Sequence, residues 1–561
     1  MKVESRGPAG PLGRVMGRTA TPSETSSVGS WARVYVGGFL IWMAGCSGVS
    51  NSPTAPSSQV STSAPVSLTA TGGDGEITLT WSSVPEADGY TLYWDTDGDV
   101  SPATGEPIRR VTSPYVHRGL SNGQSYSYIV TATADGVESP GSGETQSAPA
   151  AVASAYFPAW GNAVPDEVIV LEHDGTRTDN QNGAALKAAI EGLTAGQRLE
   201  IESGTYSINS LTSFNLQGTS EAPIWVAARE GHTPVITRPN AGQNAMNVGS
   251  SGPTRFLVLE GLEITGGSAG LRLYDCEDVW VDRCEIHHTA EAALTANTRD
   301  TARLHITRNH IHHTLGTGEG MYLGANHSAY VMRDSVIAQN HVHDCAGSQG
   351  DGIEIKQGSF GNWVVENLVH DTHYPCILVY GTDGNPFNTV ERNVCYNSDT
   401  NAMQVQGEAI VRNNLLVNGG VGFSSHDHQG SVRDLTVVHN TVINRGRGVN
   451  LSDWGGRPGM VFANNVVYSE NSQSVRFGSG SSGVEFVGNV VSGPVVGIST
   501  GFIEGSGLAD FAGLAWDASA LDPTPEAQSA IIGSGDASWE VTRDLDGNER
   551  NLPLEAGCVD G

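Results

Sequence analysis

The sequence predicts an all-β chain whose larger part is a solenoid of stacked β coils. The first observation is a repeated turn, which begins at Asn309 as Asn-His-Ile-His-His-Thr. The turn returns at separations of about 21 to 31 residues, within the range of solenoid repeats. The Asn that opens each copy is Asn309, Asn340, Asn367, Asn393, Asn414, Asn440, Asn465 or Asn489. An Asn tolerates left-handed backbone and can hydrogen-bond to an identical Asn one coil above, so we expect an Asn ladder at this turn.

The second observation is an apolar residue three positions before each of these Asn residues. The spacing predicts that one strand of each coil buries an apolar residue at the same position relative to the turn. The apolar positions are Ile306, Ile337, Val364, Val390, Val411, Val437, Phe462 and Phe486.

Composition limits the classes of partner. The chain has 561 residues, a formal charge of −30 and a pI near 4.8, and its length suggests several domains. Phosphate binding requires a basic stripe, so this acidic surface argues against a nucleic-acid partner. An acidic polysaccharide is an acceptable partner if a divalent cation bridges the two. A highly charged surface also serves solubility alone, and we expect a monomer.

Residues 1–46 are typical of an export signal. An apolar stretch of 12 residues, too short to span a bilayer, begins at Val34 and ends at Gly45. Met43-Ala44-Gly45-Cys46 resembles the bacterial lipobox, although that motif usually has Leu where Met43 stands. The resemblance implies lipidation of Cys46 and attachment to the cell envelope, at the outer membrane or the cell surface. An ordinary cleaved signal peptide is the alternative, and the Ser/Pro/Thr-rich residues 47–63 predict a flexible tether.

Residues 64–148 alternate short β runs with turns, which predicts a small β-sandwich. The segment resembles a fibronectin type III domain. Trp81 fits the core Trp of its second strand, and Leu120 with Tyr126 fits its tyrosine corner. Such modules in bacterial secreted enzymes are generally spacers or weak binders, so we assign no chemistry to this domain.

Residues 165–520 are predicted to form the solenoid, followed by a tail at 521–561. The apolar pattern from Asn182 to Leu193 predicts an amphipathic helix, which would cap the first coil. This order resembles right-handed parallel β-helix proteins, an architecture shared by many polysaccharide lyases, epimerases and some glycoside hydrolases. The fold class is therefore all-β, a right-handed parallel β-helix solenoid preceded by a fibronectin type III β-sandwich. The fold alone does not name a reaction.

Histidines recur within the repeated turn. The same slot of successive coils holds His287, His312, His343 and His370. A ladder of identical side chains is a packing device in stacked folds, and metal ligation would need convergence of ligands, so we interpret the column as structural. Of the cysteines, Cys395 and Cys376 fit inward positions. Cys276 and Cys284 are close enough in sequence for a disulfide, which nothing in the sequence requires.

A second strand follows each turn, and its alternation places two columns on the outer side of the coils. One column is expected to contain Tyr322, Glu354, Leu378, Gln404 and Ser424, and the other Gly324, Lys356, Tyr380, Gln406 and His426. Coils lie roughly 4.8 Å apart, so Lys356 should adjoin Tyr380. Glu319 and Asp351 precede this strand on the same side. Lys187 and Lys356 are the only lysines after Cys46 in an otherwise Arg-based chain, which suggests a deprotonable amine at 356; chance within an Arg-biased composition is the alternative.

Lysine, tyrosine and carboxylates together suit cleavage of a uronic-acid polymer by β-elimination. We assign Lys356 as the base and Tyr380 as the acid or proton relay, with Glu354 beside them. Glu354 would favour the charged ammonium, and Ca²⁺ held by Glu319, Asp351 and Glu354 would reverse that effect. We assign substrate contacts to Gln404, Gln406, His426 and Tyr322.

The segment 351–367 resembles alginate- and chondroitin-cleaving β-helix lyases, which carry a Lys base in such a strand, and Lys356 matches that base. Those enzymes have an Arg one coil later, where this chain has Tyr380, so the substrate and the reaction stay open. Ser425-His426-Asp427-His428 is also weakly similar to an Asp/His-rich motif of mannuronan epimerases. A glycoside hydrolase, a uronan epimerase and a non-catalytic carbohydrate-binding or adhesive solenoid are the alternatives.

Overall fold

The computed structural model describes residues 63–149, apart from 73–75, 86, 112, 114, 119, 121–122 and 135, together with residues 156–561, apart from 211. The predicted signal peptide, Cys46 and nearly all of the tether lie outside these residues. Within the described part of the chain, no helix is long and apolar enough to cross a membrane.

The first described segment forms two antiparallel sheets. One has the strand order β1-β2-β5, and the other has β4-β3-β6-β7 with β8 paired to β6. Their strands are β1 Thr69–Gly72, β2 Glu76–Thr80, β3 Gly89–Asp95, β4 Glu106–Val111, β5 Tyr115–Arg118, β6 Tyr126–Ala134, β7 Val137–Glu138 and β8 Thr145–Ser147. Trp81, Leu120 and Tyr126 all lie in its buried core, as predicted.

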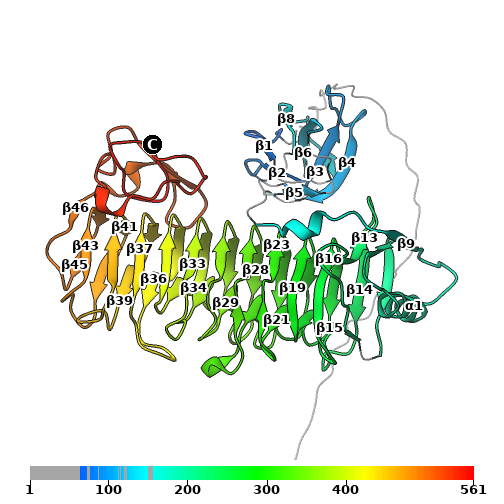
Figure 1. The fold of residues 1–561 in the computed structure, drawn as a ribbon. Coiled ribbons are helices and arrows are strands. Elements are labelled where there is room, and N and C mark those ends of the chain that lie inside the picture. The colour runs from blue at the N-terminus through cyan, green and yellow to red at the C-terminus, as the bar shows by residue number, and fades with distance from the viewer. Residues whose placement is uncertain are drawn as a thin grey trace, which may run out of the picture. The chain divides into compact units, whose positions relative to one another are not determined.

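The rest of the chain winds into coils stacked along one axis (Figure 1). Each central coil supplies one strand to a first parallel sheet, turns at the ladder Asn, and then supplies two strands to a second parallel sheet. One such coil consists of β23 His305–Thr307, β24 His310–Thr314 and β25 Met321–Leu323. The fold class predicted for the solenoid is therefore confirmed, with strands from Glu167 to Glu504.

The first sheet has 15 strands within the described residues. Besides β23 these are β9 Glu167–Leu171, β10 Gln197–Ile201, β13 Ile224–Ala228, β16 Thr254–Glu260, β19 Cys276–Asp282, β22 Thr301–Ala302, β26 Met332–Arg333, β27 Val336–Ala338, β30 Trp363–Val365, β33 Asn388–Glu391, β35 Ala409–Arg412, β37 Leu435–Val438, β40 Met460–Ala463 and β43 Glu485–Val487.

The second sheet has 23 strands over the same described range. Besides β24 and β25 these are β11 Gly204–Ser207, β12 Ser213–Phe214, β14 Pro234–Arg238, β15 Met246–Val248, β17 Glu263–Gly266, β18 Leu271–Leu273, β20 Glu285–His287, β21 Leu294–Ala296, β28 His341–Cys345, β29 Ile353–Ile355, β31 Leu368–Thr372, β32 Ile377–Val379, β34 Val394–Val405, β36 Leu415–Ser425, β38 Thr441–Asn444, β39 Arg447–Leu451, β41 Val466–Ser469, β42 Val475–Phe477, β44 Asn489–Ser492, β45 Val495–Val496 and β46 Phe502–Glu504.

The predicted apolar column forms the inside of the first sheet. Ile306 is paired with Ile337, which is paired with Val364 on the next coil. The column continues in register to Phe486, and all eight residues belong to one buried core. The six described cysteines are also buried and free, so no disulfide joins Cys276 to Cys284.

The Asn ladder is confirmed, with one correction to its backbone. In each step the side-chain amide donates to the Oδ1 of the next Asn, as from Asn340 to Asn367 at 2.9 Å and from Asn367 to Asn393 at 2.9 Å. The ladder Asn itself does not take the left-handed conformation that we expected. The residue before it does, as at Glu366 and Arg392 with φ of 54° and 53°. The left-handed residue reverses the chain, which leaves the ladder Asn free to point inward and bond along the stack.

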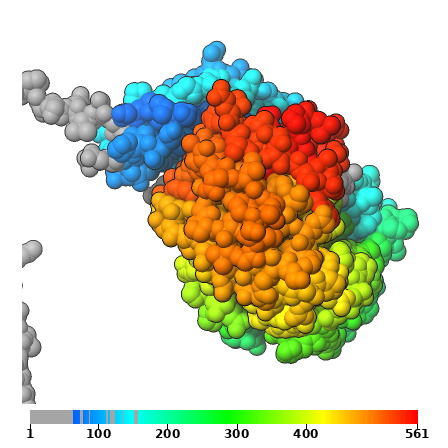
Figure 2. Space-filling model, turned by 90° about the vertical axis from the view of Figure 1, so that its left-hand side faces the viewer, coloured from blue at the N-terminus to red at the C-terminus, as the bar shows by residue number. Residues whose placement is uncertain are grey.

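A helix caps the first coil of the solenoid, and a tail packs on the outer side of its last coils. Helix α1 Asp179–Glu191 begins after Thr178, which forms a capping box with Gln181. Its Leu186 and Ile190 join the solenoid core, as expected of a cap. After Glu504 a tail follows that includes β47 Phe511–Leu514 and β48 Leu521–Pro525. Figure 2 shows this tail in red against the last coils in orange.

Candidate functional site

The two predicted outer columns exist in the register that the sequence indicated. Tyr322 is paired with Glu354, and Glu354 is paired with Leu378. In the second column, the backbone N–H groups of Lys356, Tyr380 and Gln406 each donate to the preceding coil. Adjacent coils therefore bring the side chains of Glu354, Lys356 and Tyr380 together, because parallel strands in register stack equivalent positions.

Lys356 and Glu354 form an ion pair in which each side chain is 4% exposed. The Lys356 ammonium also lies 4.6 Å from the ring centroid of Tyr322 and 5.1 Å from that of Tyr380. The faces of two aromatic rings and one carboxylate thus surround the charge, an arrangement that stabilises an ammonium ion. While this pair is closed, Nζ of Lys356 is engaged by Glu354 and is not available to act as a base.

Three buried carboxyl groups lie around this lysine. Burial raises the pKa of Asp351 well above its ordinary value, and the charges of Glu354 and Glu319 raise it further. Burial also raises the pKa of Glu319 and that of Glu354, against the opposing effect of Lys356. One ammonium therefore does not neutralise the three carboxylates, and the cluster favours either protons or an additional cation.

The two flanking tyrosines are held in the neutral form. Burial raises the pKa of Tyr380, and the nearby carboxylates of Glu354 and Asp351 raise it further. The pKa of Tyr322 is raised for the same reasons. A phenol that keeps its proton can donate it, which suits Tyr380 to an acid role and excludes it as a ready base at neutral pH.

The outer side of the columns is contacted by a loop, which the sequence did not predict. The loop after β36, residues 426–432, folds back over them. The ring of His428 lies 5.1 Å from that of Tyr380, and its Nδ1 lies 3.4 Å from Nε2 of Gln404. The Gln429 amide donates to Asn326 at 3.2 Å, across four coils. The alternation rule fixed the direction of the side chains but could not indicate a loop from a distant coil.

The predicted substrate-binding residues line the same place. Gln404 and Gln406 are buried, whereas Tyr322 and His426 are half-buried. The sequence reasoning missed two further residues. His428 contacts Tyr380 and Gln404, and the paired histidines of the segment from His426 to His428 were the available signal. Gln357 donates to Asp383 at 2.9 Å, and no sequence feature indicated it.

The residues present fit a hard cation such as Ca²⁺. Oε2 of Glu319 and Oδ1 of Asp351 are buried and have no hydrogen-bond partner within the described residues, and carboxylate oxygens are the ligands that Ca²⁺ prefers. Within the described residues, the carboxylate oxygens of Glu319, Asp351 and Glu354 do not all lie within 4.8 Å of one another. Binding would therefore require these side chains to move together.

A family match supports the fold. Residues 239–388 match the family described as a right handed beta helix region. No match was found among curated proteins. Among solved structures, the chain is similar to pectate lyase Pel9A at 14% identity, covering 73% of this chain and 100% of that one with a TM-score of 0.40. It is also similar to an alginate lyase from Paenibacillus sp. str. FPU-7 at 18% identity. That match covers 60% of this chain and 98% of the alginate lyase, with a TM-score of 0.36. A Fn3-like protein from Clostridium thermocellum is 27% identical over 17% of this chain and 96% of its own, with a TM-score of 0.15. The chain is thus a β-helix solenoid by both its own structure and the family match.

Proposed function

We propose that this protein is a polysaccharide lyase that cleaves a uronic-acid polymer by β-elimination. The observation that carries the proposal is the buried Lys356–Glu354 pair between two neutral tyrosines, with Asp351 and Glu319 beside it. It combines an amine that can serve as the base, a proton donor and a group of acidic ligands on three consecutive coils. These are the functions that elimination next to a carboxylate requires.

Lys356 and Tyr380 have opposite roles in the proposed reaction. The neutral amine of Lys356 removes the proton from C5 of the uronate. The electron pair left on C5 forms the C4–C5 double bond, and the C4–O4 bond breaks. The phenol of Tyr380 gives its proton to the departing O4 oxygen. Transfer of a proton from the Lys356 ammonium to the tyrosinate through solvent then restores both groups.

The resting ion pair must open before Lys356 can act. Glu319, Asp351 and Glu354 would be the residues that hold a cation, and a Glu354 carboxylate engaged with it would no longer pair with Lys356. A bound Ca²⁺ would also neutralise the substrate carboxylate, which makes the C5 proton more acidic. Access of a sugar to Lys356 further requires movement of the groups around it, because the lysine side chain is buried.

The buried carboxyl groups favour a second candidate, glycoside hydrolysis. Hydrolysis needs a carboxylic acid that stays protonated and a second carboxylate across the sugar. The raised pKa of Asp351 fits the acid, and Glu319 or Glu354 would be the partner. The two reactions leave different products, since only elimination creates a conjugated double bond.

The remaining sequence predictions complete the proposal. The chain would be exported and anchored through a lipid on Cys46 at the bacterial cell envelope. The β-sandwich would be a fibronectin type III spacer, and the solenoid would work as a monomer on an extracellular acidic polysaccharide.

Ultraviolet absorbance tests the proposal, because the conjugated uronate absorbs where the substrate does not. The purified chain without residues 1–46 would be mixed with alginate, pectate and chondroitin, each with Ca²⁺ or with chelator. We expect a calcium-dependent rise on at least one polymer, lowered by about 10² to 10⁴-fold in Lys356→Ala. Lys187→Ala is the matched control, because Lys187 is a lysine on the cap helix, paired with Glu191 at 3.5 Å, and its loss should change nothing.

Two results would overturn the elimination mechanism. A flat absorbance trace with new reducing ends would establish the hydrolase, and Asp351→Asn should then remove that activity. A flat trace without reducing ends, together with saturable binding of a polymer, would identify a non-catalytic binding solenoid.

A further inference from the structure

A dense group of histidines lies on the outer side of the second sheet, on the strands β20, β24, β28 and β31 of four successive coils. His310 and His341 stack as one column, with ring centroids 5.0 Å apart. The column predicted from the sequence stacks beside them in register, with centroids 5.0 to 5.1 Å apart; it runs through His287, His312, His343 and His370. The strand alternation explains both columns, because positions one and three of β24 and β28 point to the same side.

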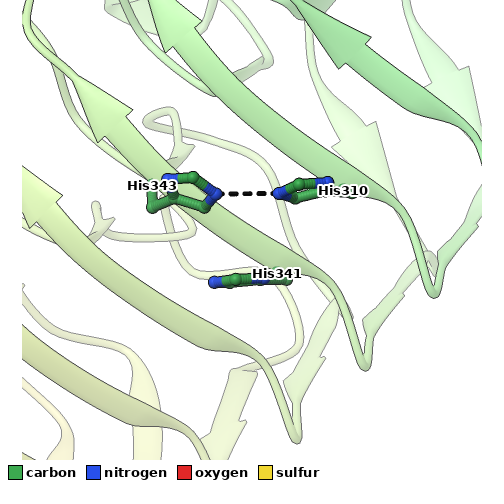
Figure 3. A group of neighbouring side chains, drawn as sticks. All are labelled: His310, His341 and His343. Atoms are coloured by element: carbon green, nitrogen blue, oxygen red, sulfur yellow. Dashed lines mark hydrogen bonds between the residues drawn. The ribbon is translucent and has the colours of Figure 1, made fainter. Parts of the chain in front are cut away.

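The two columns converge on each other, which a single ladder would not do. Nε2 of His310 lies 2.8 Å from Nε2 of His343 on the next coil, and the ring centroids of His341 and His343 are 4.5 Å apart. Figure 3 shows the rings of His310 and His343 pointing toward one another with His341 alongside. Nitrogen atoms of these three residues all lie within 4.8 Å of one another. Our interpretation of the column as packing alone rested on the absence of such convergence.

We propose that His310, His341 and His343 bind a divalent transition-metal ion. Imidazole nitrogen is a preferred ligand of Zn²⁺, Ni²⁺ and Cu²⁺, and three histidines with an open fourth position are a known zinc arrangement. The ligating nitrogens of two imidazoles on one tetrahedral zinc ion lie about 3.3 Å apart. The Nε2 atoms of His310 and His343 therefore need only a small ring rotation to bind the same ion. The ion would replace the proton that these two rings share, and it would join two consecutive coils.

A neighbouring set shares one of these residues. Glu285, His310 and His312 also place one ligand atom each within 4.8 Å of the others, with Nε2 of His312 3.0 Å from Oε1 of Glu285. His310 presents its Nδ1 to this set, at 3.8 Å from Oε1 of Glu285, and its Nε2 to His343. Loss of His310 should therefore remove either site, whereas loss of His341 or His312 affects only one.

Titration with zinc tests the site. Metal-free protein would be prepared by treatment with chelator followed by dialysis, and Zn²⁺ binding would be measured by calorimetry in the presence of excess Ca²⁺. Calcium would occupy the oxygen ligands near Lys356, so the outcome is independent of the proposed lyase. We expect one saturable zinc site and a rise in melting temperature. His310→Gln and His341→Gln should weaken binding at least about tenfold to a hundredfold, and His312→Gln should not. With Co²⁺ in place of zinc, the visible spectrum should report nitrogen ligation in the wild type, His312→Gln and His287→Gln, and this signal should be lost or weakened in His310→Gln and His341→Gln.

His287→Gln is the matched control. His287 belongs to the same stacked column and bonds to Glu263, but it lies outside both ligand sets, so its affinity for zinc should equal that of the wild type. Melting curves in chelator would verify that each variant is folded, and His343→Asn would replace any that is not. Absence of saturable binding would overturn the proposal. Equal weakening by His287→Gln and His310→Gln would also overturn it, because ladder packing would then control the affinity. Weakening by His312→Gln but not by His341→Gln would assign the ion to the neighbouring set and overturn the three-histidine site.

Discussion

The ammonium of Lys356 lies 5.1 Å from the ring centroid of Tyr380, its neighbour on the next coil. The contact links the proposed base to the proposed acid through one step of the parallel sheet. It also gives the tyrosine two separable functions. The ring helps to hold the ammonium, whereas the hydroxyl group supplies a proton.

Tyr380→Phe separates these two functions. The ring and its contact with Lys356 remain, so the affinity for substrate and the melting temperature should stay close to those of the wild type. Turnover should fall by about 10² to 10⁴-fold, because the departing oxygen loses its proton donor. Turnover would be compared by initial rates of absorbance change. Substrate affinity would be compared by binding to proteins that also carry Lys356→Ala and therefore do not turn the polymer over.

Tyr322→Phe is the control for that substitution. Tyr322 lies 4.6 Å from the same ammonium, one coil earlier, and it has no assigned proton transfer. Its loss of hydroxyl should lower turnover far less. Equal losses in the two variants would contradict the role of Tyr380 as the acid.

The carboxyl cluster should make stability fall as the pH rises. The pKa of Asp351 in the folded protein is well above its ordinary value of 3.8, so the folded state holds a proton that the unfolded state has lost. The stabilising effect is complete below the unfolded pKa and is lost as the pH rises through the folded pKa. Asp351→Asn removes this loss. The change in stability between pH 4 and pH 8 should therefore be more favourable for the variant than for the wild type, by about 1 kcal/mol or more.

Denaturant unfolding at the two pH values, with chelator present, would measure that difference. Asp174→Asn is a control of opposite sign. The hydroxyl and backbone N–H of Thr176 lower the pKa of this exposed carboxyl, so its replacement should cost stability only above its unfolded pKa. A pH dependence of Asp351→Asn identical to that of the wild type would contradict the raised pKa.

The Asn ladder should carry a large share of the stability of each coil. The side-chain amide of Asn367 donates to Ile337 at 2.9 Å and to Asn393 at 2.9 Å, while its Oδ1 accepts from Asn340 at 2.9 Å. Asn367→Ala leaves these buried groups unpaired and should lower the free energy of unfolding by about 3 kcal/mol. Thermal or denaturant unfolding would measure this, with the exposed Asn471→Ala expected within about 0.5 kcal/mol of wild type.

Repetition made most of the solenoid predictable. Equivalent residues such as Ile306, Ile337 and Val364 recur at the same position of each coil, so the sequence contained the register many times over. The outer columns followed from the alternation of side chains along a strand, which needs no tertiary information. The left-handed backbone conformation was predicted for the ladder Asn, whereas the residue before it adopts that conformation. Spacing alone does not distinguish the residue that turns the chain from the Asn that bonds along the stack.

The sequence by itself determined the β-helix, its Asn ladder, its cap helix and the adjacency of Glu354, Lys356 and Tyr380. Each of these depends on local pattern and on stacking of neighbouring coils. Only the tertiary structure decided that His428 of the loop 426–432 lies against Tyr380 and Gln404 and that His310 and His343 converge. Both depend on where side chains and loops from different coils meet in space. The length of a loop and the rotation of a ring set those positions, and neither repeats along the chain.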